Sequence, residues 1–329
     1  MKLKEKISQF PKTPGIYMMK DKNGDIIYVG KSKKLRDRIK SYFVNSSNHS
    51  RKVTRMVKGI YDIEIITTDT ELDALLLECE MIKKIRPIYN KLMKNHENYK
   101  YIRIQKNLDY PYIEVVKEID DDSLYFGPYS MERKIEEIKE ILVEFYKIRS
   151  CKRLVKCVKY DLNQCIGPCR ETITKEEYNK ILDKVKDTLI GKNKDILRSL
   201  ENKMQDEILK LNFEKASIIN NKIDLLKSFL SKQNIINTMN KKERIFAWIK
   251  LNENKYKVYI IEYGILKSSK IVETKNFDLI NINDLITEMK EKDIEPKEKQ
   301  NLINKDDIDF INIIYSYIKN HEEINYIIL

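Results

Sequence analysis

Two short apolar runs and a basic helical stretch form the strongest pattern in this sequence. Residues 15–17 (GIY) and 27–30 (IYVG) flank Asn23-Gly24. An Asn-Gly pair between two strand-like runs is a strong signal for a β-hairpin. Apolar positions then recur at helical spacing over residues 35–43, within a basic segment. The pattern therefore predicts a hairpin followed directly by a helix.

A third strand and a capped helix are expected next. Residues 61–68 alternate in polarity and are rich in β-branched side chains, which is typical of a strand. Thr70 has an acidic residue three positions later, which matches a capping box. The helix that it begins should end near Ile85, because Pro87 follows. We expect a small antiparallel sheet packed by helices, a domain over residues 12–95.

The next region, residues 96–148, predicts a strand pair and a helix. The strand candidates are residues 99–105 and 110–118, and YFGPY at 125–129 has the composition of a turn. An amphipathic helical pattern covers residues 131–148.

The remaining chain changes from helical to strand-like patterns. A helical region is expected over residues 171–235, with a break at Asn212-Phe213 that makes an antiparallel helix pair. Beyond it the predicted elements are strands between residues 244 and 271, a charged linker near 288–306, a helix over 308–319 and a strand-like tail over 324–329. Such a tail needs a partner strand, so we expect the chain to stop where a larger ancestor continues. The order of elements indicates an α/β fold of the α+β type.

Positive charge is concentrated at the N-terminal end. Residues 1–60 carry 16 Lys and Arg against 4 Asp and Glu, whereas the whole chain carries 63 against 51, so this end holds the entire net charge of +12. A segregated positive segment predicts a surface that binds a polyanion. The high lysine content of the chain explains the total number of cations but not their segregation.

Length and composition limit the class of protein. A chain of 329 residues with 42% hydrophobic content suits two to three packed domains. No apolar run approaches the roughly 18 residues of a membrane span, and the N-terminus lacks the apolar core of a signal peptide. We therefore expect a soluble, cytoplasmic protein.

Several side chains near the hairpin suit cleavage of a phosphodiester, which needs an activated water and stabilisation of charge. Tyr28 is a candidate general base if neighbouring cations lower its pKa, and Lys31 is placed to do so. Arg38 offers a planar donor fork for a phosphate. Glu78 borders the apolar side of its helix and is a candidate metal ligand. The competing interpretation is that these are packing and surface residues.

Four of the five cysteines form a cluster within residues 149–170, with the spacing C-x5-C-x7-C-x3-C. They are Cys151, Cys157, Cys165 and Cys169. In a cytosolic protein such clustering indicates a metal site more than disulfides, and four thiolates suit zinc or an iron–sulfur cluster. Buried thiols without a ligand are the alternative. Cys79 lies on an apolar helix stripe, so we expect it in the core.

Several separated motifs occur in the order known from one protein family. The stretches are residues 15–17, 28–31, 38–42, 70–78, 82–90, 125–129 and 148–151. The first three resemble the GIY-YIG nuclease signature, with YVG in place of YIG. Together the stretches resemble UvrC, the incision subunit of bacterial nucleotide excision repair.

The resemblance implies a complete first nuclease site, because every position holds the residue of the family. The implied roles are Tyr28 as general base, Tyr17 and Lys31 in support of it, Arg38 and Tyr42 near the scissile phosphate, Glu78 as the single protein ligand of Mg²⁺ or Mn²⁺, and Asn90 as a supporting residue. The resemblance also favours a [4Fe-4S] cluster on the four cysteines, with Zn²⁺ as the alternative.

Two further regions resemble parts of UvrC with differences. Residues 204–230 are similar to the UVR helical hairpin through which UvrC meets UvrB, although Asn220 and Asn221 stand where Arg and Asp are usual. Residues 241–329 resemble part of an RNase H-like region whose Asp/Asp/His metal site would lie beyond residue 329. The three histidines, at positions 49, 96 and 321, supply no replacement, so we expect no second catalytic site.

The expected function is that of a metal-dependent DNA endonuclease of nucleotide excision repair. The resemblance implies the 3′-side incision near a lesion in damaged double-stranded DNA, in complex with UvrB, and no 5′ incision. Two alternatives stay open. One is a non-catalytic, truncated UvrC paralogue that binds DNA or UvrB, and the other is a stand-alone GIY-YIG nuclease.

Overall fold

The chain divides into two compact units, which are described separately. The computed structural model describes residues 3–44, 50–130, 133–240, 244–274, 277, 282–290 and 304–329. Unit 1 comprises residues 1–96, 241–298 and 306–329, and unit 2 comprises residues 97–240 and 299–305. His49, the start of the helix predicted from Met131 and most of the charged linker predicted near 288–306 lie outside the described residues.

Unit 1 begins with the predicted small sheet. Strands β1 (Gly15–Lys20), β2 (Ile26–Ser32) and β3 (Asp62–Thr67) are ordered β2-β1-β3, and both pairs are antiparallel. The Asn23-Gly24 turn closes the hairpin, with Gly24 at φ +88°, where a residue without a β-carbon is favoured. The predicted hairpin and third strand are therefore confirmed.

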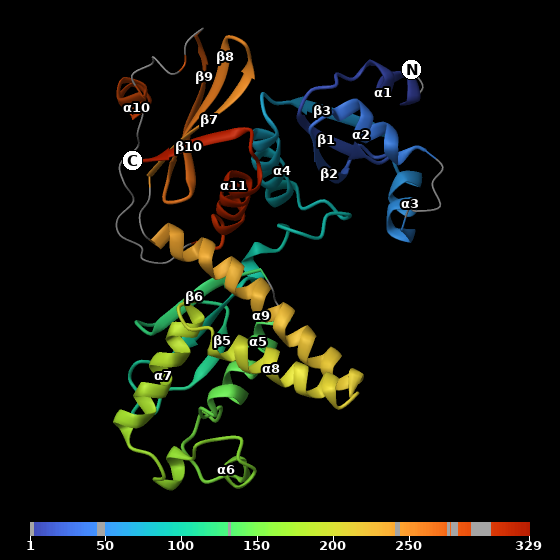
Figure 1. Ribbon diagram of the computed structural model, residues 1–329. Helices are drawn as coiled ribbons and strands as arrows, with labels where there is room; N and C mark the ends of the chain where they lie inside the picture. Colours follow the sequence, from blue (N-terminus) through green and yellow to red (C-terminus); the bar gives the residue numbers. More distant parts are fainter. Residues whose placement is uncertain are drawn as a thin grey trace. The chain divides into compact units, whose positions relative to one another are not determined.

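Side chains alternate along β1 and supply two cores, one on each face of this sheet. Tyr17 and Met19 pack with helices α1 (Leu3–Gln9), α2 (Leu35–Tyr42) and α3 (Arg51–Lys58). Ile16 and Met18 pack on the other face, against helix α4 (Glu71–Ile85). Figure 1 shows α4 beside this sheet, and its N-terminus has the predicted capping box of Thr70 and Asp73.

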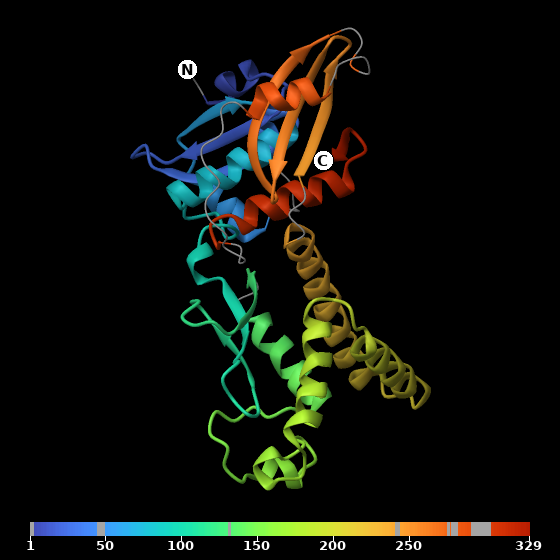
Figure 2. The same ribbon diagram turned by 90° about the vertical axis from the view of Figure 1, so that its left-hand side faces the viewer.

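A second, four-stranded sheet completes unit 1. Its strands are β7 (Arg244–Asn252), β8 (Lys255–Glu262), β9 (Ile265–Glu273) and β10 (Ile324–Ile328), in the order β10-β7-β8-β9 with every neighbouring pair antiparallel. The predicted strand-like tail is thus confirmed, and its strand finds its partner in β7. Figure 2 shows the short helix α10 (Ile282–Lys290), which the sequence analysis did not predict, lying over this sheet.

Helix α4 is part of both halves of unit 1. Its Leu72 and Cys79 are buried in a core shared with the second sheet and with helix α11 (Ile308–Asn320). Polar contacts join α4 to the same elements: the hydroxyls of Thr70 and Tyr259 are 2.7 Å apart, and Lys83 pairs with Asp309 at 3.1 Å. The expectation that Cys79 is a core residue is confirmed, since its side chain is 0% exposed.

Unit 2 contains a three-stranded sheet where a strand pair was expected. Strands β4 (Lys100–Ile104), β5 (Ile113–Val116) and β6 (Leu124–Tyr129) are ordered β5-β4-β6. The predicted turn at 125–129 is wrong, because this stretch is strand β6. A Gly-Pro pair is tolerated there since β6 is an edge strand whose register against β4 shifts at this point.

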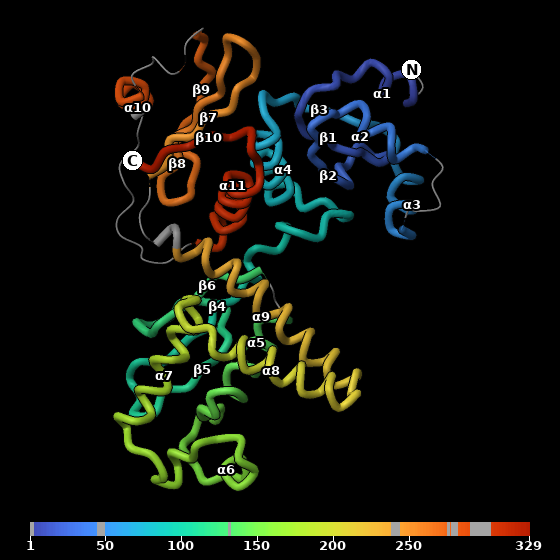
Figure 3. Tube along the Cα trace, viewed as in Figure 1, coloured from blue at the N-terminus to red at the C-terminus, as the bar shows by residue number. Residues whose placement is uncertain are grey.

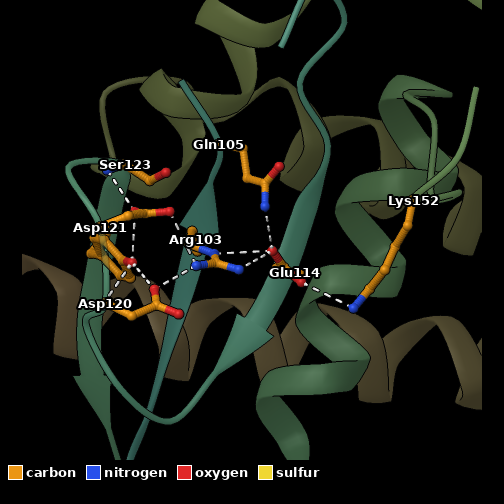
Figure 4. A network of polar contacts seen from close by, with 8 residues as sticks. Arg103, Gln105, Glu114, Asp120, Asp121, Ser123 and Lys152 are labelled. Atoms are coloured by element: carbon orange, nitrogen blue, oxygen red, sulfur yellow. Dashed lines mark hydrogen bonds and ion pairs between the residues drawn. The ribbon is translucent and has the colours of Figure 1, made fainter. Parts of the chain in front are cut away.

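A network of polar contacts around Arg103 holds this sheet together (Figure 4). The guanidinium on β4 lies 2.6 Å from a carboxylate oxygen of Glu114 on β5 and 2.6 Å from one of Asp120 in the loop before β6. Lys152, in the cysteine segment, reaches the same Glu114 at 3.6 Å. Desolvation lowers the pKa of Arg103, but Tyr125 and the carboxylates of Glu114 and Asp120 together raise it above its usual value.

The helices of unit 2 follow the predicted pattern with one additional break (Figure 3). They are α5 (Lys134–Tyr146), α6 (Val158–Asp161), α7 (Lys175–Leu189), α8 (Asp195–Leu209) and α9 (Phe213–Asn240), with short 3-10 turns at His96–Asn98, at its boundary with unit 1, and Pro168–Arg170. The break at Asn212-Phe213 is confirmed. A second break after α7 includes Gly191 at φ +80°. Among the described helices, none is long and apolar enough to cross a membrane.

The contact between Thr70 and Tyr259 predicts a measurable coupling between the two halves of unit 1. Thr70→Ala should lower the free energy of unfolding by about 1 kcal/mol for the lost cap and by roughly a further 1–3 kcal/mol for the unpaired Tyr259 hydroxyl. Urea unfolding followed by fluorescence of Trp248, the single tryptophan of the chain and a residue of β7, measures this loss. Thr70→Ser is the control and should retain most of the stability; equal losses in both variants would contradict the assignment.

Candidate active site

Three tyrosines from three elements meet on one face of the first sheet. Tyr17 on β1, Tyr28 on β2 and Tyr42 on α2 have ring centroids 5.9–6.4 Å apart. The hydroxyls of Tyr17 and Tyr42 are hydrogen-bonded at 2.8 Å. Arg38 donates to the Tyr42 hydroxyl at 3.2 Å and lies 5.0 Å from the centre of that ring. The structure therefore brings together the three phenols and the guanidinium that were expected at the site.

Glu78 reaches this site from α4. The backbone N–H of Lys31 donates to its Oε1 at 3.1 Å, which fixes the carboxylate beside the end of β2. Among the described residues, no partner for its other oxygen, Oε2, is found. Burial raises the pKa of Glu78, although the Lys31 N–H and the charges of Lys31 and Arg38 act in the opposite direction. The carboxylate is thus half-buried, oriented, and open at one oxygen.

Asn90 supports the strand that carries Tyr28. Its side-chain Oδ1 accepts from the N–H of Val29 at 3.0 Å, and its Nδ2 donates to the carbonyl of Val29 at 2.9 Å. The amide therefore pairs with β2 as a neighbouring strand would, directly beside Tyr28. These two hydrogen bonds are the geometry through which Asn90 would support the site, as was expected of it.

The structure pairs the Lys31 ammonium with a carboxylate and not with Tyr28. The Lys31 ammonium lies 2.5 Å from Oε1 of Glu71, at the first turn of α4. The pKa of Tyr28 is raised, first by burial and then by Tyr42 and Glu78, and only Arg38 opposes this shift among the main causes. Burial is thus the main reason that the pKa of Tyr28 lies above its usual value, and Lys31 is not among the main causes that act on it.

Two residues of the site were missed as functional candidates. Glu71 is 7% exposed and pairs with both Lys31 and Lys33, at 2.5 and 2.8 Å. Although burial raises its pKa, the two lysines hold the pKa of Glu71 below its usual value. Its spacing of seven residues from Glu78 placed both carboxylates on one helix face, which was the available signal.

Gly30 is the second missed residue, since it was noted only as part of the YVG motif. It lies opposite Tyr17 in the hairpin register. A β-carbon on Gly30 would lie 2.4 Å from the Tyr17 hydroxyl oxygen, so any side chain there displaces the phenol. The hairpin register alone would have revealed this close approach.

The donor set fits a divalent cation of the Mg²⁺ or Mn²⁺ kind. Such ions prefer oxygen ligands, and Mg²⁺ commonly uses one or two carboxylates with waters and substrate phosphates. Glu78 supplies one such carboxylate with an open oxygen. In the described part of the chain, no group of three or more His, Cys, Asp or Glu is arranged to hold a metal, so no complete protein cage competes with this site.

The structure does not support the metal site expected at the four clustered cysteines. The four clustered cysteines form no disulfide: they are Cys151, Cys157, Cys165 and Cys169. Burial is the main cause that raises the pKa of Cys165, and the other three cysteines lie close enough to raise it further. The thiols thus lie near one another, but within the described residues they are not arranged as a metal-ligand group. The predicted [4Fe-4S] or Zn²⁺ site is therefore not supported by this arrangement.

The fold and the polar site define a GIY-YIG nuclease domain, and comparisons with known families agree. A model described as the UvrC-like GIY-YIG domain matches residues 13–91, and one described as the UvrC/Cho excinuclease middle domain matches residues 99–188. The chain belongs to the UvrC family.

Curated relatives extend the match to most of the chain. It is 35% identical over 292 residues to UvrABC system protein C of Acetivibrio thermocellus, covering 86% of this chain and 46% of that protein. The corresponding protein of Clostridioides difficile is 37% identical over 294 residues, covering 86% of this chain and 48% of the relative. The chain therefore spans about half the length of these relatives.

Solved structures of a GIY-YIG endonuclease domain match the N-terminal region. One of them is the crystal structure of the GIY-YIG N-terminal endonuclease domain of UvrC from Thermotoga maritima bound to its catalytic divalent cation, magnesium. It is 39% identical and covers 27% of this chain and 97% of that one, with a TM-score of 0.25. A TM-score at this level supports no comparison of the two folds.

The close approach at Gly30 predicts a specific loss of stability. Gly30→Ala should lower the free energy of unfolding by roughly 1–3 kcal/mol, because the added methyl group must displace the buried Tyr17 ring. Gly59→Ala is the matched control, since its β-carbon would meet only ordinary contacts from 3.4 Å outward. Unfolding monitored through Trp248 compares the two, and a similar small effect in both would show that the Tyr17 contact is unimportant.

Proposed function

We propose that this chain is a metal-dependent DNA endonuclease of nucleotide excision repair, which makes the 3′-side incision near a lesion in complex with UvrB. The observation that carries the proposal is the convergence of Tyr28, Arg38 and Glu78, from three separate elements, on one half-buried site. The match to UvrABC system protein C over most of the chain supports the repair context.

Arg38 is the residue that binds and orients the scissile phosphate. Its guanidinium is held by the Tyr42 hydroxyl and ring, which leaves further N–H donors for phosphoryl oxygens. Donors that are fixed before the reaction stabilise developing charge without reorganisation. The concentration of positive charge in residues 1–60 supplies the longer-range attraction for a DNA backbone.

Tyr28 is the candidate proton acceptor for the attacking water. Its pKa is raised by burial, by Tyr42 and by the negative charge of Glu78. Arg38 acts in the opposite direction, and compensation of the Glu78 charge would lower the pKa further. A Mg²⁺ or Mn²⁺ ion held by Glu78 would supply that compensation together with Lewis-acid stabilisation of the phosphoryl oxygens. Tyr17 and Tyr42 hold the phenol in position by packing.

The hairpin of α8 and α9 is the proposed contact with UvrB. Its tip exposes large apolar side chains, with Leu209 at 81%, Leu211 at 73% and Phe213 at 61% exposure. Exposed apolar groups gathered at the end of a polar hairpin are typical of a protein–protein contact. Asn220 and Asn221 are exposed on the same helix, so their difference from the family pattern alters surface polarity and not the packing of the hairpin.

The apolar tip predicts a separable effect on partner binding. Phe213→Ala should weaken binding to UvrB about 10-fold or more, as is typical for an aromatic anchor, while Trp248 fluorescence and thermal unfolding stay as in the parent. Calorimetric titration with UvrB measures the affinity. Tyr61→Ala, an exposed aromatic in unit 1, is the control; equal binding by both variants would exclude the tip as the contact.

The nuclease proposal is tested by incision of a lesion-bearing duplex with UvrB and Mg²⁺. The parent should give a 3′-side nick, and Glu78→Ala should reduce the rate at least 100-fold because the carboxylate assigned to the cation is lost. Glu80→Gln, which changes an exposed carboxylate on the same helix, should cut like the parent.

Each alternative function has its own result in this experiment. Salt-dependent DNA binding by the parent without any metal-dependent nick would identify a non-catalytic binding protein. Cleavage of undamaged DNA without UvrB would identify a stand-alone nuclease. A Glu78→Ala variant that nicks as fast as the parent would remove the basis of the proposed metal site.

A further inference from the structure

Lys31 contacts two glutamates of α4 through different groups. Its backbone N–H donates to Glu78 at 3.1 Å, and its ammonium pairs with Glu71 at 2.5 Å. The two glutamates are seven residues apart on one helix face, which corresponds to about 10 Å along the axis. Lys31 and Arg38 are both close enough to Glu78 for their charges to act on it. The charge of the Lys31 ammonium therefore acts on Glu78 as well, although its hydrogen bond is to Glu71.

An ammonium on Glu78 would interfere with a cation there. It would occupy the open carboxylate oxygen, and its positive charge would repel a divalent ion in a partly desolvated site, where charges interact more strongly than in water. A group that holds the Lys31 ammonium near the first turn of α4 therefore keeps Glu78 available to a cation.

Glu71 is well suited to hold it. Its side chain is only 7% exposed, and it lies in the first turn of α4, where a negative charge is favoured by the helix dipole. It also receives the Lys33 ammonium at 2.8 Å, but Lys33 is shared with Glu323, 3.5 Å away. Lys31, Lys33, Glu71 and Glu323 form a chain of ion pairs, with His321 Nε2 3.7 Å from Oε2 of Glu71. Glu71 is the partner of Lys31 in this chain.

We propose that Glu71 is a positioning residue of the nuclease site: it holds the Lys31 ammonium at the first turn of α4 and so keeps Glu78 available to a divalent cation. This inference rests on the proposed function, since it assigns Glu78 to the cation. Glu71 itself does not touch the substrate or the metal, and its effect passes through Lys31 alone.

A cycle of variants in the full chain isolates this effect, with Mn²⁺ binding measured by calorimetry and by the electron paramagnetic resonance signal of free Mn²⁺. Glu71→Gln should weaken Mn²⁺ binding about 10-fold, the lower end of the usual range for residues that orient metal ligands. Lys31→Met should bind Mn²⁺ at least as tightly as the parent. The double variant should bind as Lys31→Met does, because Glu71 has no ammonium left to hold.

The controls separate this mechanism from a general loss of charge or fold. Glu80→Gln removes an exposed carboxylate from the same helix and should leave Mn²⁺ affinity unchanged. Trp248 fluorescence verifies that each variant is folded. The proposal is overturned if Glu71→Gln binds Mn²⁺ as tightly as the parent. It is also overturned if Glu71→Gln weakens Mn²⁺ binding as much in the Lys31→Met variant as it does in the parent.

The same measurements distinguish this inference from the nuclease function. A parent that binds no Mn²⁺, or binds it equally well after Glu78→Ala, overturns both the cation site and the role of Glu71. A parent that binds Mn²⁺ through Glu78 with the expected variant pattern, but does not nick DNA, leaves the role of Glu71 intact and removes the endonuclease function.

Discussion

The hydrogen bond from the Lys31 N–H to Glu78 is the constraint on which the site depends. It joins the end of β2 to the middle of α4, and so it sets a carboxylate of one element against the phenols of three others. Helix α4 can present Glu78 with this precision because it is packed on both sides, against the first sheet and against the second sheet with α11. The second half of unit 1 therefore helps to define a site to which it contributes no proposed catalytic residue.

Electrostatics at this site are set mostly by burial. Desolvation is the largest cause that raises the pKa of Tyr17, Tyr28 and Glu78, and Arg38 opposes the shift in each case. Glu71 differs, because two lysines offset the effect of its burial and hold its pKa below the usual value. The site thus combines packed phenols, one open carboxylate and one carboxylate occupied by lysines. Under the proposed function, the open carboxylate faces the cation and the Arg38 guanidinium faces the phosphate.

The sequence predicted those elements whose signals are local. The Asn-Gly turn, the Thr70 capping box and the break at Asn212-Phe213 are each specified by a few adjacent residues, and the structure contains all three. Strand β6 was mistaken for a turn because Gly and Pro reveal local geometry but not an edge position in a sheet. The partner of Lys31 was missed because side-chain pairing over 40 positions follows from the packing of α4 and leaves no local pattern. The cysteine spacing likewise predicted proximity but could not specify a ligand geometry.

The most direct test of this account is anomalous diffraction from crystals of the protein soaked with Mn²⁺. We expect one strong anomalous peak within coordination distance of Oε2 of Glu78, facing Tyr28 and Arg38, with the Lys31 ammonium still on Glu71. A peak elsewhere in unit 1 with none at Glu78, or a Lys31 ammonium seated on Glu78, would contradict the central claim that α4 presents this carboxylate to a divalent cation.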